Sequence, residues 1–83
     1  MTQYDEAAKR RIRWVAMRRG LLELDIVLNK FLATEFDALT DDELAVFCQI
    51  LDLPDQEFLS IVNGKSEPED PALLPLINRL RAV

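Results

Sequence analysis

The segment Arg18-Arg19-Gly20-Leu21-Leu22-Glu23-Leu24-Asp25 holds the residues with the clearest potential for chemistry. It brings a basic pair, one of the two glycines and two carboxylates together between two stretches of helical periodicity. A glycine inside a helix costs about 1 kcal/mol relative to alanine, so Gly20 is expected at a helix–helix junction or where another backbone approaches closely. The segment is therefore either a capped turn or a contact surface for a partner.

The absence of histidine argues against an enzyme. The 83 residues hold none, which removes Ser–His and Cys–His nucleophile pairs, histidine general acids and most zinc sites. Asp41, Asp42 and Glu43 are adjacent and point in different directions around a helix, so we expect no metal site there. The single cysteine, Cys48, excludes an internal disulfide and is expected as a small core residue.

Charge is distributed unevenly along the chain. Residues 1–19 carry six cationic and two acidic side chains, a net charge of +4, whereas residues 20–83 carry four cationic and thirteen acidic side chains, a net charge of −9. The total of −5 argues against general affinity for nucleic acid. This pattern is typical of a dipolar protein whose basic first helix is steered toward an acidic partner.

Composition indicates one small globular domain over residues 1–83, with 49% hydrophobic and 30% charged residues. No stretch approaches the ~20 apolar residues of a membrane span. The early acids Asp5 and Glu6 do not fit a signal peptide. We therefore expect a cytoplasmic protein that does not insert into membranes.

The periodicity of apolar residues predicts an all-α fold, a small five-helix bundle. The first helix is expected from about Asp5 to Arg19, with Ala8, Ile12, Val15 and Ala16 facing inward. Trp14 falls among arginines, away from this aliphatic face. It either packs under a neighbouring helix, the commoner outcome, or is available to a partner.

The second and third helices have broad apolar stripes. The second follows Gly20, with these inward positions: Leu21, Leu22, Leu24, Ile26, Leu28, Phe31 and Leu32. Glu23 lies on the opposite face and is expected to be exposed. Thr40-Asp41-Asp42-Glu43 is a capping box that begins the third helix. The third helix is expected to bury these four: Leu44, Phe47, Cys48 and Leu51.

The last two helices are bounded by proline and glycine. The segment 52–55 ends the third helix and begins a short fourth helix that stops at Gly64. Its expected inward residues are Phe58, Leu59 and Val62. Asp70 and Pro71 are expected as the N-cap and first position of the last helix, which starts or kinks at Pro75.

Structural interpretations of the Gly20 segment remain open beside the functional one. With Gly20 as N-cap, Glu23 is the third helical residue and bonds back to the Gly20 amide. Alternatively, Arg19 and Glu23 form an ordinary i,i+4 ion pair, and Asp25 is a favourable first-turn acid. The basic run 9–13 is either a solvated face or a binding surface.

The Arg-Gly-x-x-Glu core, taken with its surroundings, resembles the SdhE (YgfY-like) family of assembly factors. The residues that carry the resemblance are 18–25 with Trp14, Phe31, Glu35-Phe36, Leu39, Asp42-Glu43, Phe47 and the late Asn63-Gly64 turn. The likeness extends from about residue 7 to 80. This chain departs from many relatives at 58–61, where they carry a tryptophan, and at Pro75.

The resemblance implies a five-helix bundle that is not an enzyme. It implies a factor that binds the flavoprotein subunit of succinate dehydrogenase or fumarate reductase and promotes covalent attachment of FAD to a histidine of that subunit. The partner carries the FAD and no cofactor is stably bound to the factor, which is expected to be a monomer. Carried onto this sequence, the partner-binding residues are Arg19, Gly20 and Glu23, with Trp14, Arg18 and Asp25 beside them.

Two other binding functions compete with this interpretation. The first is an antitoxin-like helical module that neutralises a protein partner, since composition alone does not exclude it. The second, weaker one is a nucleic-acid module built on the basic first helix, which predicts salt-sensitive binding to duplex DNA.

Overall fold

The computed structural model describes residues 4–18 and 20–83, and all regular structure in those residues is helical. The elements are α1 (Glu6–Ala16), α2 (Leu22–Thr34), η1 (Phe36–Ala38), α3 (Asp41–Leu51), α4 (Asp55–Val62), η2 (Pro71–Leu73) and α5 (Leu74–Ala82). The predicted all-α fold with five α-helices is confirmed. Within the described residues, no helix is both long enough and apolar enough to cross a membrane.

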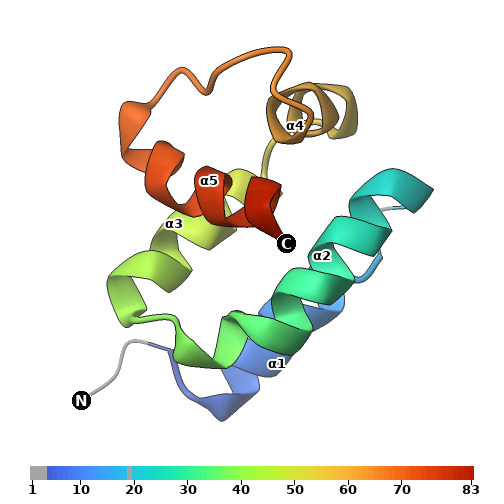
Figure 1. Ribbon diagram of the computed structural model, residues 1–83. Helices are drawn as coiled ribbons and strands as arrows, with labels where there is room; N and C mark the ends of the chain where they lie inside the picture. Colours follow the sequence, from blue (N-terminus) through green and yellow to red (C-terminus); the bar gives the residue numbers. More distant parts are fainter. Residues whose placement is uncertain (1–3, 19) are drawn as a thin grey trace.

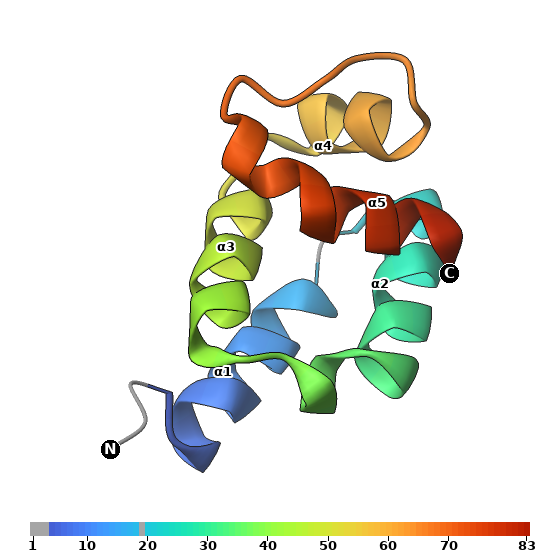
Figure 2. The ribbon, with the colours of Figure 1, turned by 60° about the vertical axis from the view of Figure 1, so that its left-hand side comes forward.

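Helices α2 and α3 form the two walls of the molecule. Helix α1 packs against both walls at one end, and α5 packs against both at the other (Figures 1 and 2). Helix α4 lies against α5. The resulting body measures 38 × 26 × 20 Å along its principal axes. This arrangement leaves the outer faces of α1 and α2 without a helix over them.

Phe47 of α3 links three elements in the core. Its ring centroid lies 5.2 Å from that of Phe31 in α2 and 5.9 Å from that of Phe36 in η1, both in tilted arrangements. Tilted aromatic pairs contribute roughly 0.5–1.5 kcal/mol beyond the area they bury. Every fully buried side chain in the described part of the chain is apolar. The aromatic cluster therefore holds α2 and α3 at a defined separation.

Helix α1 is attached to this core by few contacts. Ala16 is its one buried residue. The guanidinium of Arg13 lies 4.9 Å above the Phe36 ring, and its Nη2 donates to Asp37 Oδ1 at 2.9 Å. Arg13 thus joins α1 to η1 through both a cation–π contact and an ion pair.

Most helix boundaries follow the predicted local signals, but α1 ends at Ala16, before the predicted end near Arg19. At the start of α3, the Glu43 amide donates to Thr40 Oγ1 at 3.2 Å and the Thr40 amide donates to Glu43 Oε1 at 2.9 Å, so the capping box is confirmed. Asp70 Oδ1 accepts from the Ala72 amide at 2.9 Å and caps η2, whereas α5 itself begins at Leu74. Pro75 lies in the first turn of α5, where amides have no partner within the helix. Proline therefore begins this helix and does not kink it.

Several burial predictions were wrong. Val15, Leu22 and Ile26, expected to face inward, have 45%, 74% and 46% of their surface exposed. Cys48 is half-buried instead of lying in the core. Ile50 and Ile61 are buried, although they were not predicted to face inward. Neighbouring helices cover only part of the surface of α1 and α2, so apolar residues on the uncovered sides of these helices are exposed to solvent.

We expect Thr40→Ala to lower the free energy of unfolding by about 1 kcal/mol, because the Glu43 amide loses its acceptor. This corresponds to a fall in Tm of roughly 4–8 °C for a chain of this size. Urea unfolding followed by circular dichroism measures it. Thr34→Ala is the matched control, since Thr34 only donates from its hydroxyl to the Lys30 carbonyl within α2. An equal loss in both variants would contradict the capping role.

Glu43 also accepts from Arg79 Nη1 at 2.6 Å. The Thr40 backbone amide, helped by the Arg79 charge, lowers the pKa of Glu43 from its ordinary value of 4.5. A carboxyl with a lowered pKa in the folded state stabilises the fold at neutral pH, and that contribution is lost as pH falls through the lowered value.

Wild type is therefore expected to exceed Glu43→Gln in free energy of unfolding at neutral pH, with a difference that shrinks as pH falls below about 4.5. Urea unfolding at several pH values measures this difference. A constant gap down to strongly acid pH would show that the charge of Glu43 does not contribute.

Candidate partner-binding site

The junction between α1 and α2 forms the candidate site. Helix α1 ends at Ala16, and the Arg18 amide donates to the Val15 carbonyl at 3.2 Å in the turn that follows. Helix α2 begins at Leu22 with Leu21 as its N-cap. Arg19, predicted at the centre of the binding surface and as an ion-pair partner of Glu23, lies outside the described residues.

Gly20 adopts a backbone conformation that favours glycine. Its φ is +84°, in the left-handed region that costs other L-residues about 1–2 kcal/mol. It is exposed, and a Cβ added there would meet no heavy atom within 4 Å. The turn therefore requires glycine for its dihedral angle, and it also leaves space beside the backbone.

The structure overturns the capping interpretation of this segment. Leu21, not Gly20, is the N-cap of α2, and it makes no side-chain cap hydrogen bond. Glu23 is consequently the second helical residue, one position too early for a capping box. It is exposed as predicted. Its carboxylate lies in the first turn, where the helix dipole favours negative charge.

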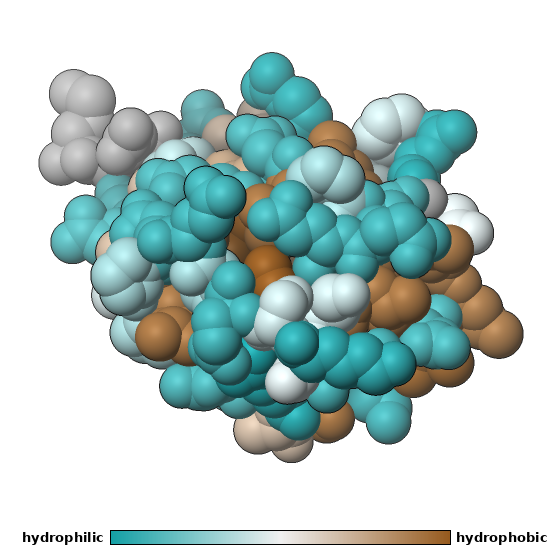
Figure 3. Space-filling view, turned by 90° about the horizontal axis from the view of Figure 1, so that it is seen from above, coloured by the Kyte–Doolittle hydropathy of each residue, from teal (hydrophilic) through white to brown (hydrophobic). Residues whose placement is uncertain are grey.

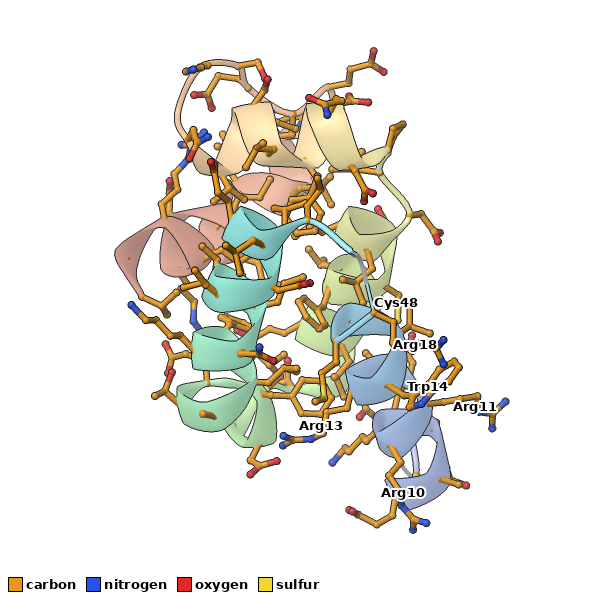
Figure 4. The ribbon with its side chains drawn as sticks, turned by 90° about the vertical axis from the view of Figure 1, so that its right-hand side faces the viewer. Arg10, Arg11, Arg13, Trp14, Arg18 and Cys48 are labelled. Atoms are coloured by element: carbon orange, nitrogen blue, oxygen red, sulfur yellow. The ribbon has the colours of Figure 1, made fainter. Side chains whose placement is uncertain are left out.

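Trp14 is exposed, which contradicts the expectation that a neighbouring helix covers it. It shows 58% of its surface, and the Arg18 guanidinium lies 4.2 Å from its ring centroid. Trp14 and the buried Ala16 differ by about 200° around the helix, so the indole points away from the core. Figure 4 shows Trp14 and Arg18 together on the outer side of α1. The pair presents a flat aromatic face with a cation over it.

Exposed apolar side chains gather on both sides of this turn. Of the six large apolar side chains exposed in the described residues, five lie between positions 14 and 26: Trp14, Val15, Met17, Leu22 and Ile26. Apolar atoms line the edge of the molecule at which α2 begins (Figures 1 and 3). Concentrations of this kind mark interaction surfaces more often than scattered single residues do.

Sequence reasoning missed Leu22 and Ile26 as surface residues. At 100° per residue, both lie more than about 120° from the centre of the stripe formed by the buried α2 residues. The apolar face predicted for this helix included them. Their angular distance from the other apolar residues of the helix is the signal that identifies them as surface residues.

The outer face of α1 is basic. Arg10 and Arg11 are exposed, and neither forms an ion pair with a described residue. Figure 4 shows Arg13 extending in a different direction, consistent with its ion pair to Asp37. The α5 arginines contrast with Arg10 and Arg11, because Arg79 pairs with Glu35 and Glu43, and Arg81 pairs with Glu67. Positive charge on α1 is thus available to an external partner.

Asp25 occupies the first turn of α2, as predicted. The side chain is half-buried, and its Oδ1 is buried without a hydrogen-bond partner among the described residues. This oxygen is turned away from solvent. Asp25 is therefore placed beside the exposed turn, and its buried oxygen offers no contact to a partner.

The described residues near the α1–α2 junction supply no reactive group. A shallow groove of about 240 Å³ between α1 and α3 is lined by Arg11, Ile12, Val15, Cys48, Leu51 and Asp52. Burial raises the pKa of the Cys48 thiol, and Asp52 adds to that shift, so the thiol is protonated at neutral pH. The described residues contain no group of three potential metal ligands. The described part of the site offers apolar contact area and a protonated thiol.

Comparison with known proteins gives consistent matches over most of the chain. A family described as "flavinator of succinate dehydrogenase" matches residues 10–83. The FAD assembly factor SdhE of Legionella pneumophila (strain Lens) is 40% identical over 93% of this chain and 95% of the relative. The factor of the same name from Ralstonia nicotianae is 35% identical over 98% and 88%. That from Coxiella burnetii is 38% identical over 89% of each chain.

Gly20→Ala and Gly64→Ala are expected to lower the free energy of unfolding by similar amounts, about 1 kcal/mol each. Both glycines have positive φ, +84° and +78°, and neither has an atom within 4 Å of an added Cβ. Urea unfolding of the two variants measures the cost. A much larger loss at Gly20 would show that this turn has a structural role beyond its dihedral angle.

Proposed function

Because this chain belongs to the family of flavinators of succinate dehydrogenase, whose relatives are FAD assembly factors, we propose that it binds the flavoprotein subunit of succinate dehydrogenase or fumarate reductase. Bound there, it promotes covalent attachment of FAD to a histidine of that subunit. The observation that carries this proposal is the exposed α1–α2 turn, where Gly20 is open and five exposed apolar side chains lie between positions 14 and 26.

The proposed binding residues are those of the turn and its two flanks. The open space at Gly20 lets a partner backbone approach closely, and the exposed Glu23 accepts hydrogen bonds from it. The stacked Trp14 and Arg18 supply an aromatic contact and a directional cation. The remaining proposed members are Arg19, next to Gly20 in sequence, and Asp25, in the first turn of α2.

The mechanism is positional. The factor stabilises a flavoprotein conformation in which the flavin and the acceptor histidine are aligned, and attachment then proceeds within the flavoprotein. A ligand that binds one conformation preferentially shifts the population toward it. The lack of histidine in these 83 residues is consistent with this mechanism, because the partner supplies the residue that is modified.

FAD is carried by the partner in this proposal. A phosphate-binding loop needs several closely spaced glycines, whereas the two glycines here, Gly20 and Gly64, lie in separate turns. We place the factor in the cytoplasm as a monomer that meets its flavoprotein client there.

Co-expression tests the proposal in cells that lack their own factor. Wild type is expected to raise the covalent flavin fluorescence of a succinate dehydrogenase flavoprotein subunit in a denaturing gel. Glu23→Ala is expected to reduce that gain several-fold, since the partner loses an acceptor at the contact.

Glu57→Ala is the matched control. Glu57 is also an exposed first-turn acid, in α4, so both substitutions remove the same helix-dipole interaction. Glu57→Ala is expected to retain the wild-type gain. No gain with folded wild-type protein would refute the proposed function, and equal losses in both variants would assign the effect of Glu23 to helix stability.

A further inference from the structure

Leu22 and Ile26 form an apolar pair on the outer face of α2. They are one helical turn apart, with 74% and 46% of their surface exposed. Single exposed leucines are ordinary in proteins. Here the pair directly follows the open turn at Gly20, and Glu23 lies between its members in sequence. Its position therefore extends the proposed contact surface along α2.

The charge on the helix before the Gly20 turn, and in the turn itself, favours an acidic partner over a second copy of the same chain. Arg10 and Arg11 lie on α1, Arg18 lies in the turn that follows it, and all three are exposed. Two copies meeting through this surface across a two-fold axis would bring these cations toward each other. A partner surface with an apolar centre and surrounding carboxylates would complement both the pair and the arginines.

We propose that Leu22 and Ile26 are the apolar anchor through which this protein binds such a surface on the flavoprotein. This inference rests on the proposed function and assigns different roles to different residues of the site. The anchor supplies affinity, because removing exposed apolar surface from water at an interface is favourable for binding. Gly20 and Glu23 then act in alignment once the complex has formed.

A titration separates affinity from alignment. Purified flavoprotein subunit lacking covalent flavin is incubated with FAD and increasing factor, and both the half-maximal factor concentration and the plateau rate of covalent attachment are measured. The double variant Leu22→Gln/Ile26→Gln is expected to raise the half-maximal concentration roughly tenfold or more and to reach the wild-type plateau rate. Glu23→Ala is expected to lower the plateau rate.

Glutamine forms helices well, so the double variant is expected to keep the wild-type circular dichroism and urea unfolding midpoint. Val83→Gln is the matched control. Val83 is the remaining exposed large apolar residue of the described chain, and it lies beside Ala33 and Thr34 at the far end of α2. It is expected to titrate like wild type.

Any of three results would overturn the anchor. In the first, the folded double variant has the same half-maximal concentration and plateau rate as wild type. In the second, the double variant lowers only the plateau rate, as expected for Glu23→Ala. In the third, sedimentation shows that wild type self-associates and that the double variant does not, which would make this surface an interface between copies.

A direct binding measurement distinguishes failure of the anchor from failure of the proposed function. If wild type promotes no attachment, the affinities of wild type and the double variant for the flavoprotein are compared without FAD turnover. A roughly tenfold difference then supports the anchor, although the proposed function has failed. Equal affinities, or no binding by either protein, overturn it.

Discussion

The contact between the rings of Phe47 and Phe36 is the constraint on which the candidate site depends. Phe47 also touches Phe31 of α2, so one side chain of α3 sets the position of both α2 and η1. Helix α1 is attached to the same cluster, because Arg13 of α1 stacks on Phe36 and pairs with Asp37. The two helices that flank Gly20 are therefore positioned by the same aromatic core. This core thereby fixes the positions of both ends of the turn.

The arginines divide into two groups with different consequences. Those of α5 are partly buried and used within the fold, where Arg79 connects the end of α2 to the start of α3 and Arg81 donates to the Ile61 carbonyl at 2.9 Å. Those on the outer face of α1 do not pair with described carboxylates, apart from Arg13 on its other side. The net charge of the chain is negative, yet the helix beside the candidate site presents positive charge.

Local sequence signals predicted the helix boundaries well and burial less well. The capping box at Thr40 and the start at Asp70 depend on side chains that bond to amides two or three residues away, so short patterns contain the information. Whether Trp14 is covered depends on how the short helices pack against one another, which helical spacing alone does not give. Leu22 and Ile26 lie opposite the buried residues of α2, so helical spacing does indicate their exposure. Of the candidate site, the exposure of Glu23 and the helix–helix junction at Gly20 were correctly predicted. The left-handed dihedral angle of Gly20 was not predicted, because glycine adopts negative φ about as readily.

The absence of histidine has a consequence for how the protein responds to its surroundings. Histidine is the one side chain whose ordinary pKa places its charge change between pH 5 and 8, and this chain has none. The pKa shifts of the described residues also lead away from neutrality, upward for the Tyr4 hydroxyl and the Cys48 thiol and downward for the Glu43 carboxyl. No histidine charge therefore changes in this chain between mildly acid and mildly alkaline conditions. In the assembly step that we propose, any histidine that titrates is one of the client.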